Sequence, residues 1–469
     1  MNVEKRNPFA FFEKMGRIGS RIFLNKYFFL ALFCAAAVIT ALDKEVEGAV
    51  AFVCVICAAL VFCDDIMAIA LPLTLLSAFV TTCYDSAETF MQYVWMAVPA
   101  VLSIVFHFVV YRGKFKIGTS FWGLAAVSVA LTLGGVGFIS AEEYFAGSAL
   151  YHTFFLGFVM LGFYLLLKSQ LSRKREYDLI EMMMKILYVT GIFVCLMVAV
   201  HALPQTEFEG GIRLALEFQP GNNLSTLLMF ALPCPFFFAR KNYLHLLSVC
   251  LMMAALVFGA SRAGLLLGAV ELVICIIVSA VWDKPKRFFY VCTLVCFAGA
   301  AFAMRAQIFE LLEKAGMYPV VAADEARMGL IDRAFEYFKR WPVFGHGLGF
   351  KGNYDIYDPK QGALGWYHMM IPQVIGSMGI VGIAAYLFQA VLHVRIGIRA
   401  ISSADADRKG AVITLLLSYV GVLMMSQVNP GLFCPLPYGL IAMAIFAALD
   451  GEKGLEPMLD MKRRLRKNK

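Results

Sequence analysis

The chain contains 469 residues, of which 61% are hydrophobic and only 16% are charged. Soluble domains carry roughly 25% charged residues, so this composition excludes a soluble globular protein. The formal net charge of +8 does not require a nucleic-acid partner, because the basic residues gather in loops on one side of the apolar segments. The sequence therefore predicts a polytopic membrane protein.

Apolar runs of about 16 to 24 residues recur along the chain, and each is long enough to cross a bilayer as a helix. Backbone groups in hydrocarbon must be hydrogen-bonded within their own segment, which favours helices over barrel strands for runs of this length. We therefore expect an all-α polytopic membrane protein with about 14 transmembrane helices. The runs begin near Tyr27, Ala49, Ile66, Phe90, Ile117, Ala149, Leu179, Leu224, Tyr243, Leu265, Phe288, Gly379, Ala411 and Tyr438.

The position of these runs predicts how the chain is organised. A long segment of mixed polar and apolar residues interrupts the series, and we expect it to contain an amphipathic helix. The predicted parts are 1–26, a cytoplasmic amphipathic segment; 27–304, transmembrane helices 1–11; 305–371, a long extracytoplasmic loop; 372–449, helices 12–14; and 450–469, a basic cytoplasmic tail.

The distribution of charge predicts the orientation. Most of the 41 Lys and Arg residues fall in segments that would share one side of the membrane, and this side is expected to be cytoplasmic, with both termini there. The short loops on the other side are acidic instead, as in Asp43, Glu45 and Glu47. The basic tail is expected to rest on anionic lipids.

Two short outer segments each carry an arginine. Arg213 lies before Pro220 and Asn222, where a new helix can be capped, and Arg262 lies in a glycine-rich hairpin between two spans. Either guanidinium could bind an anionic group at the membrane surface. The alternatives are a surface pair between Arg213 and Glu217, and snorkelling of Arg262 at a helix end.

The long loop predicts an amphipathic helix over residues 326–341. Its apolar stripe has helical spacing, its arginines lie at the edge of that stripe or on another face, and Trp341-Pro342 ends it. A glycine-rich turn follows, in which backbone amides could face an anion; His346 within it is interpreted as incidental. The cations Arg333, Lys339 and Arg340 could equally belong to a solvated face. The stripe comprises Leu330, Ile331, Ala334, Phe335 and Phe338.

His368 stands immediately before the segment that re-enters the membrane. A histidine at this boundary can accept a proton near neutral pH, so it is a candidate general base. The alternative is an interfacial side chain in an aromatic belt with Trp366 and Tyr367.

Metal and cofactor signals are weak. The chain has 12 cysteines, all in or at the ends of apolar runs, and Cys54-x-x-Cys57 has no second ligand pair. The sequence contains no Walker loop, dinucleotide fingerprint or HExxH motif. We therefore expect neither a metal nor another cofactor.

The order of these motifs resembles the O-antigen ligase and polymerase superfamily of membrane glycosyltransferases. The resemblance covers roughly residues 213–386 and implies a GT-C-like, inverting, metal-independent enzyme of the bacterial cytoplasmic membrane. It would transfer a glycan from a polyprenyl diphosphate carrier to an acceptor hydroxyl. The motifs are an outer Arg followed by Pro-Gly-Asn, a Ser-Arg-x-Gly hairpin, Trp-Pro-x-x-Gly-x-Gly-x-Gly, and a His before a Gly-x-x-Gly helix.

The resemblance also assigns residues. Arg213 and Arg262 match the arginines that bind the diphosphate, and His368 matches the loop histidine. The chain departs from the pattern at Met369, where Asn or Ser is frequent, and at Gly221, which separates Pro220 from Asn222. The expected substrate-binding residues are Arg327, Arg333, Tyr367 and Asn223.

A second class of function is a lipid-oligosaccharide flippase or transporter, which would also need many spans and cations. Such a protein should carry charges deep within several spans, whereas these spans hold few beyond Lys185 and Glu271. Within the enzyme class, the sequence leaves ligase and polymerase open.

Overall fold

The computed structural model describes the greater part of the chain. The described residues are 10–82, 93–111, 113, 117–135, 150, 153–171, 173, 175–202, 221–259, 261–303, 305–306, 309, 321–348, 367, 369–428, 432 and 436–450.

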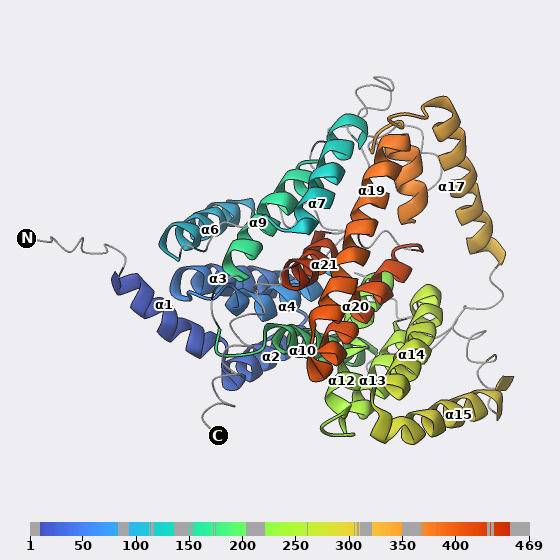
Figure 1. Cartoon of the computed structure of the whole chain (residues 1–469), viewed down its shortest axis with the longest axis horizontal. Helices are drawn as coiled ribbons and strands as arrows, with labels where there is room; N and C mark the ends of the chain where they lie inside the picture. The colour runs from blue at the N-terminus through green and yellow to red at the C-terminus, as the bar shows by residue number, and fades with distance from the viewer. Residues whose placement is uncertain are drawn as a thin grey trace, which may run out of the picture.

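All the regular elements described in the first part of the chain are helices (Figure 1). They are α1 (Ala10–Phe23), α2 (Lys26–Ala41), α3 (Glu45–Phe62), η1 (Ile66–Ile69), α4 (Ala70–Thr82), η2 (Val94–Met96), α6 (Ala97–Val110), α7 (Thr119–Ala130), η3 (Leu131–Gly135), η5 (Thr153–Val159), α9 (Met160–Leu171) and α10 (Leu179–Ala202).

The described elements of the second part are helices as well, which confirms the all-α prediction for the described residues. They are α11 (Gly221–Ala231), α12 (Cys234–Ala239), α13 (His245–Phe258), α14 (Arg262–Trp282), η6 (Lys284–Lys286), α15 (Arg287–Ala303), α17 (Val321–Arg340), α19 (Met370–Ser403), α20 (Ala406–Met425) and α21 (Leu436–Leu449).

The described helices confirm a polytopic membrane protein. Seven are long and apolar enough to cross a bilayer, and shorter apolar helices accompany them. Every apolar run noted in the sequence overlaps a described helix, but the number of about 14 spans stays a prediction. The predicted amphipathic segment contains α1, which is bent by 64° from α2.

Helices α14 and α20 run antiparallel, which orients one half of the bundle. Gly410 packs against Trp282, while Gly421, further along α20, packs against Glu271, which precedes Trp282 in α14. Gly410 also contacts Arg240, and the Lys286 ammonium donates to the Arg240 carbonyl over 2.7 Å. We call this the basic end of the bundle, and the end that holds the starts of α11 and α14 the opposite end.

Helix α10, in the first half of the chain, runs from the basic end to the opposite end. The Lys241 ammonium lies 3.5 Å from the Glu181 carboxylate near the start of α10, and Gly191 in α10 packs against Ala231 and Met252. The end of α10, with His201, therefore lies at the opposite end, where α11 begins.

A network of buried charges holds the basic end of the first half. The Arg175 guanidinium lies 3.0 Å from the Asp65 carboxylate, with only 7% and 14% of the two side chains exposed. The Tyr177 hydroxyl donates to the same carboxylate over 2.6 Å. Burial opposes the charge of Arg175, but the Asp65 carboxylate raises the pKa of the guanidinium above its usual value. These charges are paired within the chain and serve the fold.

Candidate functional site

The starts of α11 and α14 are joined at the opposite end of the bundle. The Ser261 hydroxyl, which caps α14 by accepting from the Gly264 amide over 2.9 Å, donates to the Asn222 side-chain oxygen over 2.6 Å. Ser261 is therefore a helix cap and a link between two helices at once. The link places the first residue of α14, Arg262, beside the start of α11.

Asn223 and the start of α21 belong to the same end. The Tyr438 hydroxyl donates to the Asn223 carbonyl over 2.8 Å, and both residues are buried. Asn223 thus helps to fix the first turn of α11 through its backbone. A direct contact between its side chain and a substrate stays a prediction.

The end of α20 connects this group of helices to the start of α19. The Met370 amide donates to the Ser426 carbonyl over 2.9 Å, and the Leu432 amide donates to the Ser426 hydroxyl over 3.0 Å. Since α20 runs antiparallel to α14, its last turn lies at the opposite end. The starts of α11, α14, α19 and α21 therefore meet at this end.

The glycine-rich turn after α17 docks into a break in α19 (Figure 1). Gly379 has φ 58° within α19, which interrupts the helical backbone. The amides of His346 and Gly347 donate to the carbonyls of Gly376 and Ser377, both over 3.0 Å. In the other direction, the Ile380 amide donates to the Pro342 carbonyl over 2.8 Å. Two irregular segments thus satisfy each other's backbone groups, as buried backbone requires.

This docking corrects the interpretation of the turn as an anion site. The Gly345 amide donates to the Trp341 carbonyl over 3.0 Å, and the Leu348 amide donates to the Gly135 carbonyl over 2.7 Å. Together with the amides of His346 and Gly347, all four amides from 345 to 348 are used within the fold. The positive φ of Gly345 and Gly347 allows the turn to pack against α19, and the turn does not form an anion site.

His346 and Tyr367 form a buried polar network behind the turn. The Tyr367 hydroxyl lies 2.7 Å from His346 Nε2, and neither residue is exposed. The Tyr367 amide donates to the Gln373 side chain over 3.0 Å, and Gln373 donates to the Ser377 hydroxyl over 2.9 Å. Burial lowers the pKa of His346 to about 3, so the ring is neutral at physiological pH. His346 therefore anchors the turn within the fold, and its lack of a chemical role stays a prediction.

The predicted amphipathic helix is α17, which begins at Val321 rather than near residue 326 and ends at Arg340. Its buried residues Leu330 and Ala334 pack with Tyr367 and Met369. Phe335 is 48% exposed, so the predicted stripe was too wide at this position. Packing against Tyr367 and Met369 brings α17 to the start of α19, on the side away from α7 (Figure 1).

The predicted site residues are only partly placed. Arg213 and His368 lie outside the described residues, and Arg262 and Arg327 are described by their backbone positions at the start of α14 and within α17. Arg333 is half-buried on α17, and Tyr367 and Asn223 are buried as described above. Their assigned roles in binding and catalysis stay predictions.

Sequence reasoning missed the residues that tie these segments together. Gln373, Ser377 and Ser426 carry the hydrogen bonds between the loop, α19 and α20. The Ser-Arg-x-Gly motif did contain one signal, because a serine directly before an apolar helix predicts an N-cap. Its bond to Asn222 is a tertiary contact that local pattern does not reveal.

Comparison with known families identifies part of this arrangement. Residues 247–387 match a family model described as O-antigen ligase, which confirms the resemblance found in the sequence. The matched segment includes Arg262, Arg327, Arg333, Tyr367 and His368, while Arg213 and Asn223 precede it. A comparison with curated proteins found no match.

Proposed function

We propose that this membrane protein, whose residues 247–387 match the O-antigen ligase family, is a glycan-transferring enzyme of the ligase and polymerase kind. It is an inverting, metal-independent glycosyltransferase in this proposal. The donor is a glycan on a polyprenyl diphosphate carrier, and the acceptor is a hydroxyl group of a second glycan or lipid-linked glycan. Transfer takes place at the outer face of a bacterial cytoplasmic membrane.

One observation supports this proposal most directly. The hydrogen bond between Ser261 and Asn222 and that between Met370 and Ser426 bring the starts of α11, α14 and α19 to the same end of the bundle. In sequence, these starts follow or flank Arg213, Arg262 and His368. A donor-binding segment and a proton-accepting segment can therefore meet a substrate at one membrane face.

The proposed donor chemistry concerns the leaving group. Displacement of the diphosphate from the anomeric carbon develops negative charge on its oxygens, and fixed guanidinium groups can stabilise this charge. Arg213 and Arg262 carry this role in our proposal. The start of α14 adds the positive end of a helix dipole beside Arg262.

The proposed acceptor chemistry requires a base. His368 accepts the proton of the attacking hydroxyl, which then attacks the anomeric carbon from the face opposite the diphosphate. Its neighbours are firmly held, because Tyr367 is fully buried and the Met370 amide is bound to Ser426. Arg327 and Arg333 on α17 are proposed to contact the glycan, while Tyr367 and Asn223 support the site from the buried side.

The decisive experiment tests Arg262. The purified protein is incubated, without added metal, with polyprenyl diphosphate-linked glycan and a set of candidate acceptors. We expect Arg262→Lys to lower transfer by roughly 10²- to 10³-fold at normal thermal stability, because the ammonium cannot reproduce the bidentate contact. The matched control Arg305→Lys changes an exposed arginine whose guanidinium donates to the Phe302 carbonyl.

Three outcomes would contradict the proposal. Wild-type transfer by Arg262→Lys would make Arg262 an anchoring residue, and loss of transfer with a chelator at unchanged thermal stability would indicate a catalytic metal. Movement of the donor lipid across vesicles without any glycan transfer would favour a flippase.

The membrane orientation is tested separately by cysteine labelling. Cysteines introduced at Glu142, Gly210 and Asp355 should react with an impermeant thiol reagent from outside, whereas cysteines introduced at Lys174 and Asp407 should not. Reaction of Asp355→Cys only from the inside would overturn the proposed face of the site.

A further inference from the structure

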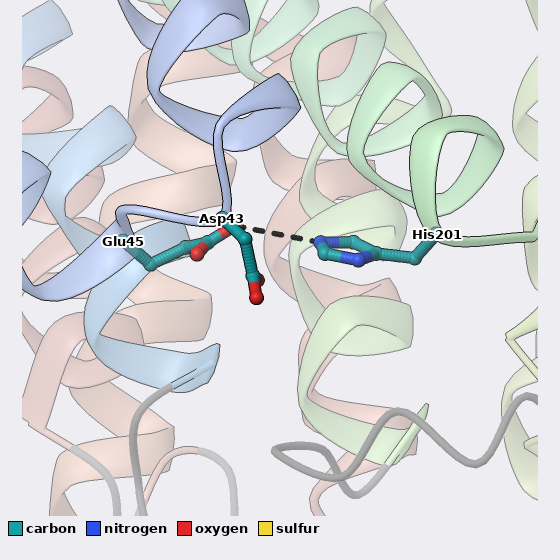
Figure 2. Close-up of side chains that lie close together, drawn as sticks. All are labelled: Asp43, Glu45 and His201. Carbon is teal, nitrogen blue, oxygen red and sulfur yellow. Dashed lines mark ion pairs between the residues drawn. The ribbon is translucent and has the colours of Figure 1, made fainter.

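Three side chains with metal-binding atoms converge where the turn between α2 and α3 meets the end of α10 (Figure 2). Asp43 lies in the turn, Glu45 begins α3, and His201 lies in the last turn of α10. One ligand atom from each residue lies within 4.8 Å of the other two. His201 is far in sequence from Asp43 and Glu45, and none of the three belongs to the segment matched by the O-antigen ligase family.

The backbone aims the two carboxylates at the imidazole. Asp43 has φ 55°, a left-handed conformation that aspartate tolerates better than most residues. It reverses the chain after α2, so that Asp43 and Glu45 both lie close to His201. In Figure 2 the Glu45 carboxylate is directed at the imidazole, and the Asp43 carboxylate lies to one side of this pair. The neighbouring Lys44 points elsewhere, since its ammonium lies 3.3 Å from the Glu47 carboxylate.

The burial of Glu45 is the second observation. This residue is only 8% exposed. Its Oε1 atom makes no hydrogen bond and lies 3.4 Å from His201 Nε2, with which it forms an ion pair when the imidazole is protonated. A buried carboxylate without a hydrogen bond is costly unless a cation compensates for it, and a bound divalent ion would replace the proton of His201 in this role. With a neutral imidazole, the three residues present two negative charges and one nitrogen ligand to the same point.

We propose that Asp43, Glu45 and His201 bind a divalent transition-metal ion of the Zn²⁺ or Mn²⁺ kind. Imidazole nitrogen together with carboxylate oxygen suits such ions, whereas Mg²⁺ and Ca²⁺ prefer oxygen ligands alone. The exposed Asp43 leaves the remaining coordination positions open to water.

The bound ion would have a structural role. It would hold the turn between α2 and α3 to the end of α10, and His201 lies shortly before the segment 203–220 that carries Arg213. The ion would therefore fix the position of the end of α10, from which the chain continues toward Arg213. It takes no part in the transfer chemistry proposed above, so metal binding and transfer can be tested independently.

The test is titration of Zn²⁺ into tag-free protein in detergent, followed by calorimetry. We expect one saturable site in the wild type and weaker binding of Mg²⁺ and Ca²⁺. Glu45→Gln and His201→Gln should each weaken the Zn²⁺ affinity by roughly 10- to 100-fold or more, since even outer-shell partners contribute this much. Co²⁺ substitution supplies a visible absorption spectrum that reports nitrogen and oxygen ligation.

Two further variants make the result specific. Glu47→Gln removes a carboxylate from the same first turn of α3 but leaves the cluster intact, so it should bind Zn²⁺ like the wild type. Asp43→Asn changes an exposed residue, so it should fold normally and bind more weakly even where Glu45→Gln proves unstable. Absence of saturable Zn²⁺ binding in the wild type, or equal affinities in Asp43→Asn and Glu47→Gln, would overturn the proposal.

Discussion

The two ends of the bundle satisfy their polar groups in different ways. At the basic end, charges are neutralised within the chain, as in the pair of Arg175 and Asp65. Around the starts of α11, α14 and α19, the contacts that the structure describes join neutral groups instead, such as Ser261 with Asn222 and His346 with Tyr367.

This difference bears on the roles proposed for the arginines at the two ends. An arginine already held by a buried carboxylate has little capacity left for a second anion, and its loss leaves that carboxylate unpaired. Arg262 instead begins a helix within Gly259–Gly264, a stretch that contains no acidic residue. The basic end therefore uses charge for stability, whereas binding of an anionic substrate by Arg262 at the opposite end stays a proposal.

The largest expected effect is the loss of the base at the opposite end. His368→Ala should lower the turnover of glycan transfer by roughly 10²- to 10⁴-fold, because a general base contributes this much to the rate. Donor affinity, measured with a lipid diphosphate that cannot react, should change little. A variant that transfers normally would show that proton transfer does not depend on this residue.

Loss of an arginine at the basic end should instead reduce stability. Arg175→Met leaves Asp65 buried without its partner, so the free energy of unfolding should fall by about 3–5 kcal/mol, measured by denaturation in mild detergent. The control is Arg21→Met, whose pair with Glu176 spans 3.9 Å with 78% and 90% of the side chains exposed. Exposed pairs contribute little, so equal losses in the two variants would contradict the comparison.

The sequence was sufficient to predict the elements at both ends but not how they join. Hydrophobic run length predicted the helices, because a membrane imposes their minimum length. The end of α17 at Arg340 followed from Trp341-Pro342, since proline restricts the residue before it and cannot continue the helix. The start of α17 has no comparable signal and was misplaced.

The contacts that build the site depend on packing between distant segments. The break at Gly379 lies in an apolar run that reads as a continuous helix. It is explained only by the docking of the segment 342–347 against α19. Likewise, the amides of His346 and Gly347 donate to carbonyls of α19, and the Leu348 amide donates to the Gly135 carbonyl. The convergence of Glu45 and His201 follows from the tertiary packing of helices, which neither spacing nor composition encodes locally.

The junction between the turn and α19 should be sensitive to a single methyl group. A Cβ at Gly379 would lie 2.5 Å from the Pro342 carbonyl oxygen, and the residue has φ 58°. Gly379→Ala should therefore cost about 1–3 kcal/mol of stability, seen as a lower unfolding midpoint. The matched control is Gly162→Ala in α9, where a Cβ meets nothing within 4 Å and alanine favours the helix. An unchanged midpoint for Gly379→Ala would show that the turn can be displaced at little cost.

The smallest effect is a pH dependence that arises from His346. Burial lowers the pKa of His346 in the folded protein to about 3, from 6.5 for the ordinary side chain, so between these values the unfolded chain binds the extra proton. Its contribution to stability is therefore complete above pH 6.5 and declines as the pH falls toward 3, with a slope of at most about 1.4 kcal/mol per pH unit. His346→Gln keeps a polar side chain beside Tyr367 but cannot titrate, so its unfolding midpoint should fall less steeply than that of the wild type between about pH 6 and pH 5. Parallel curves for the two proteins would mean that the imidazole can become charged without leaving its place behind the turn.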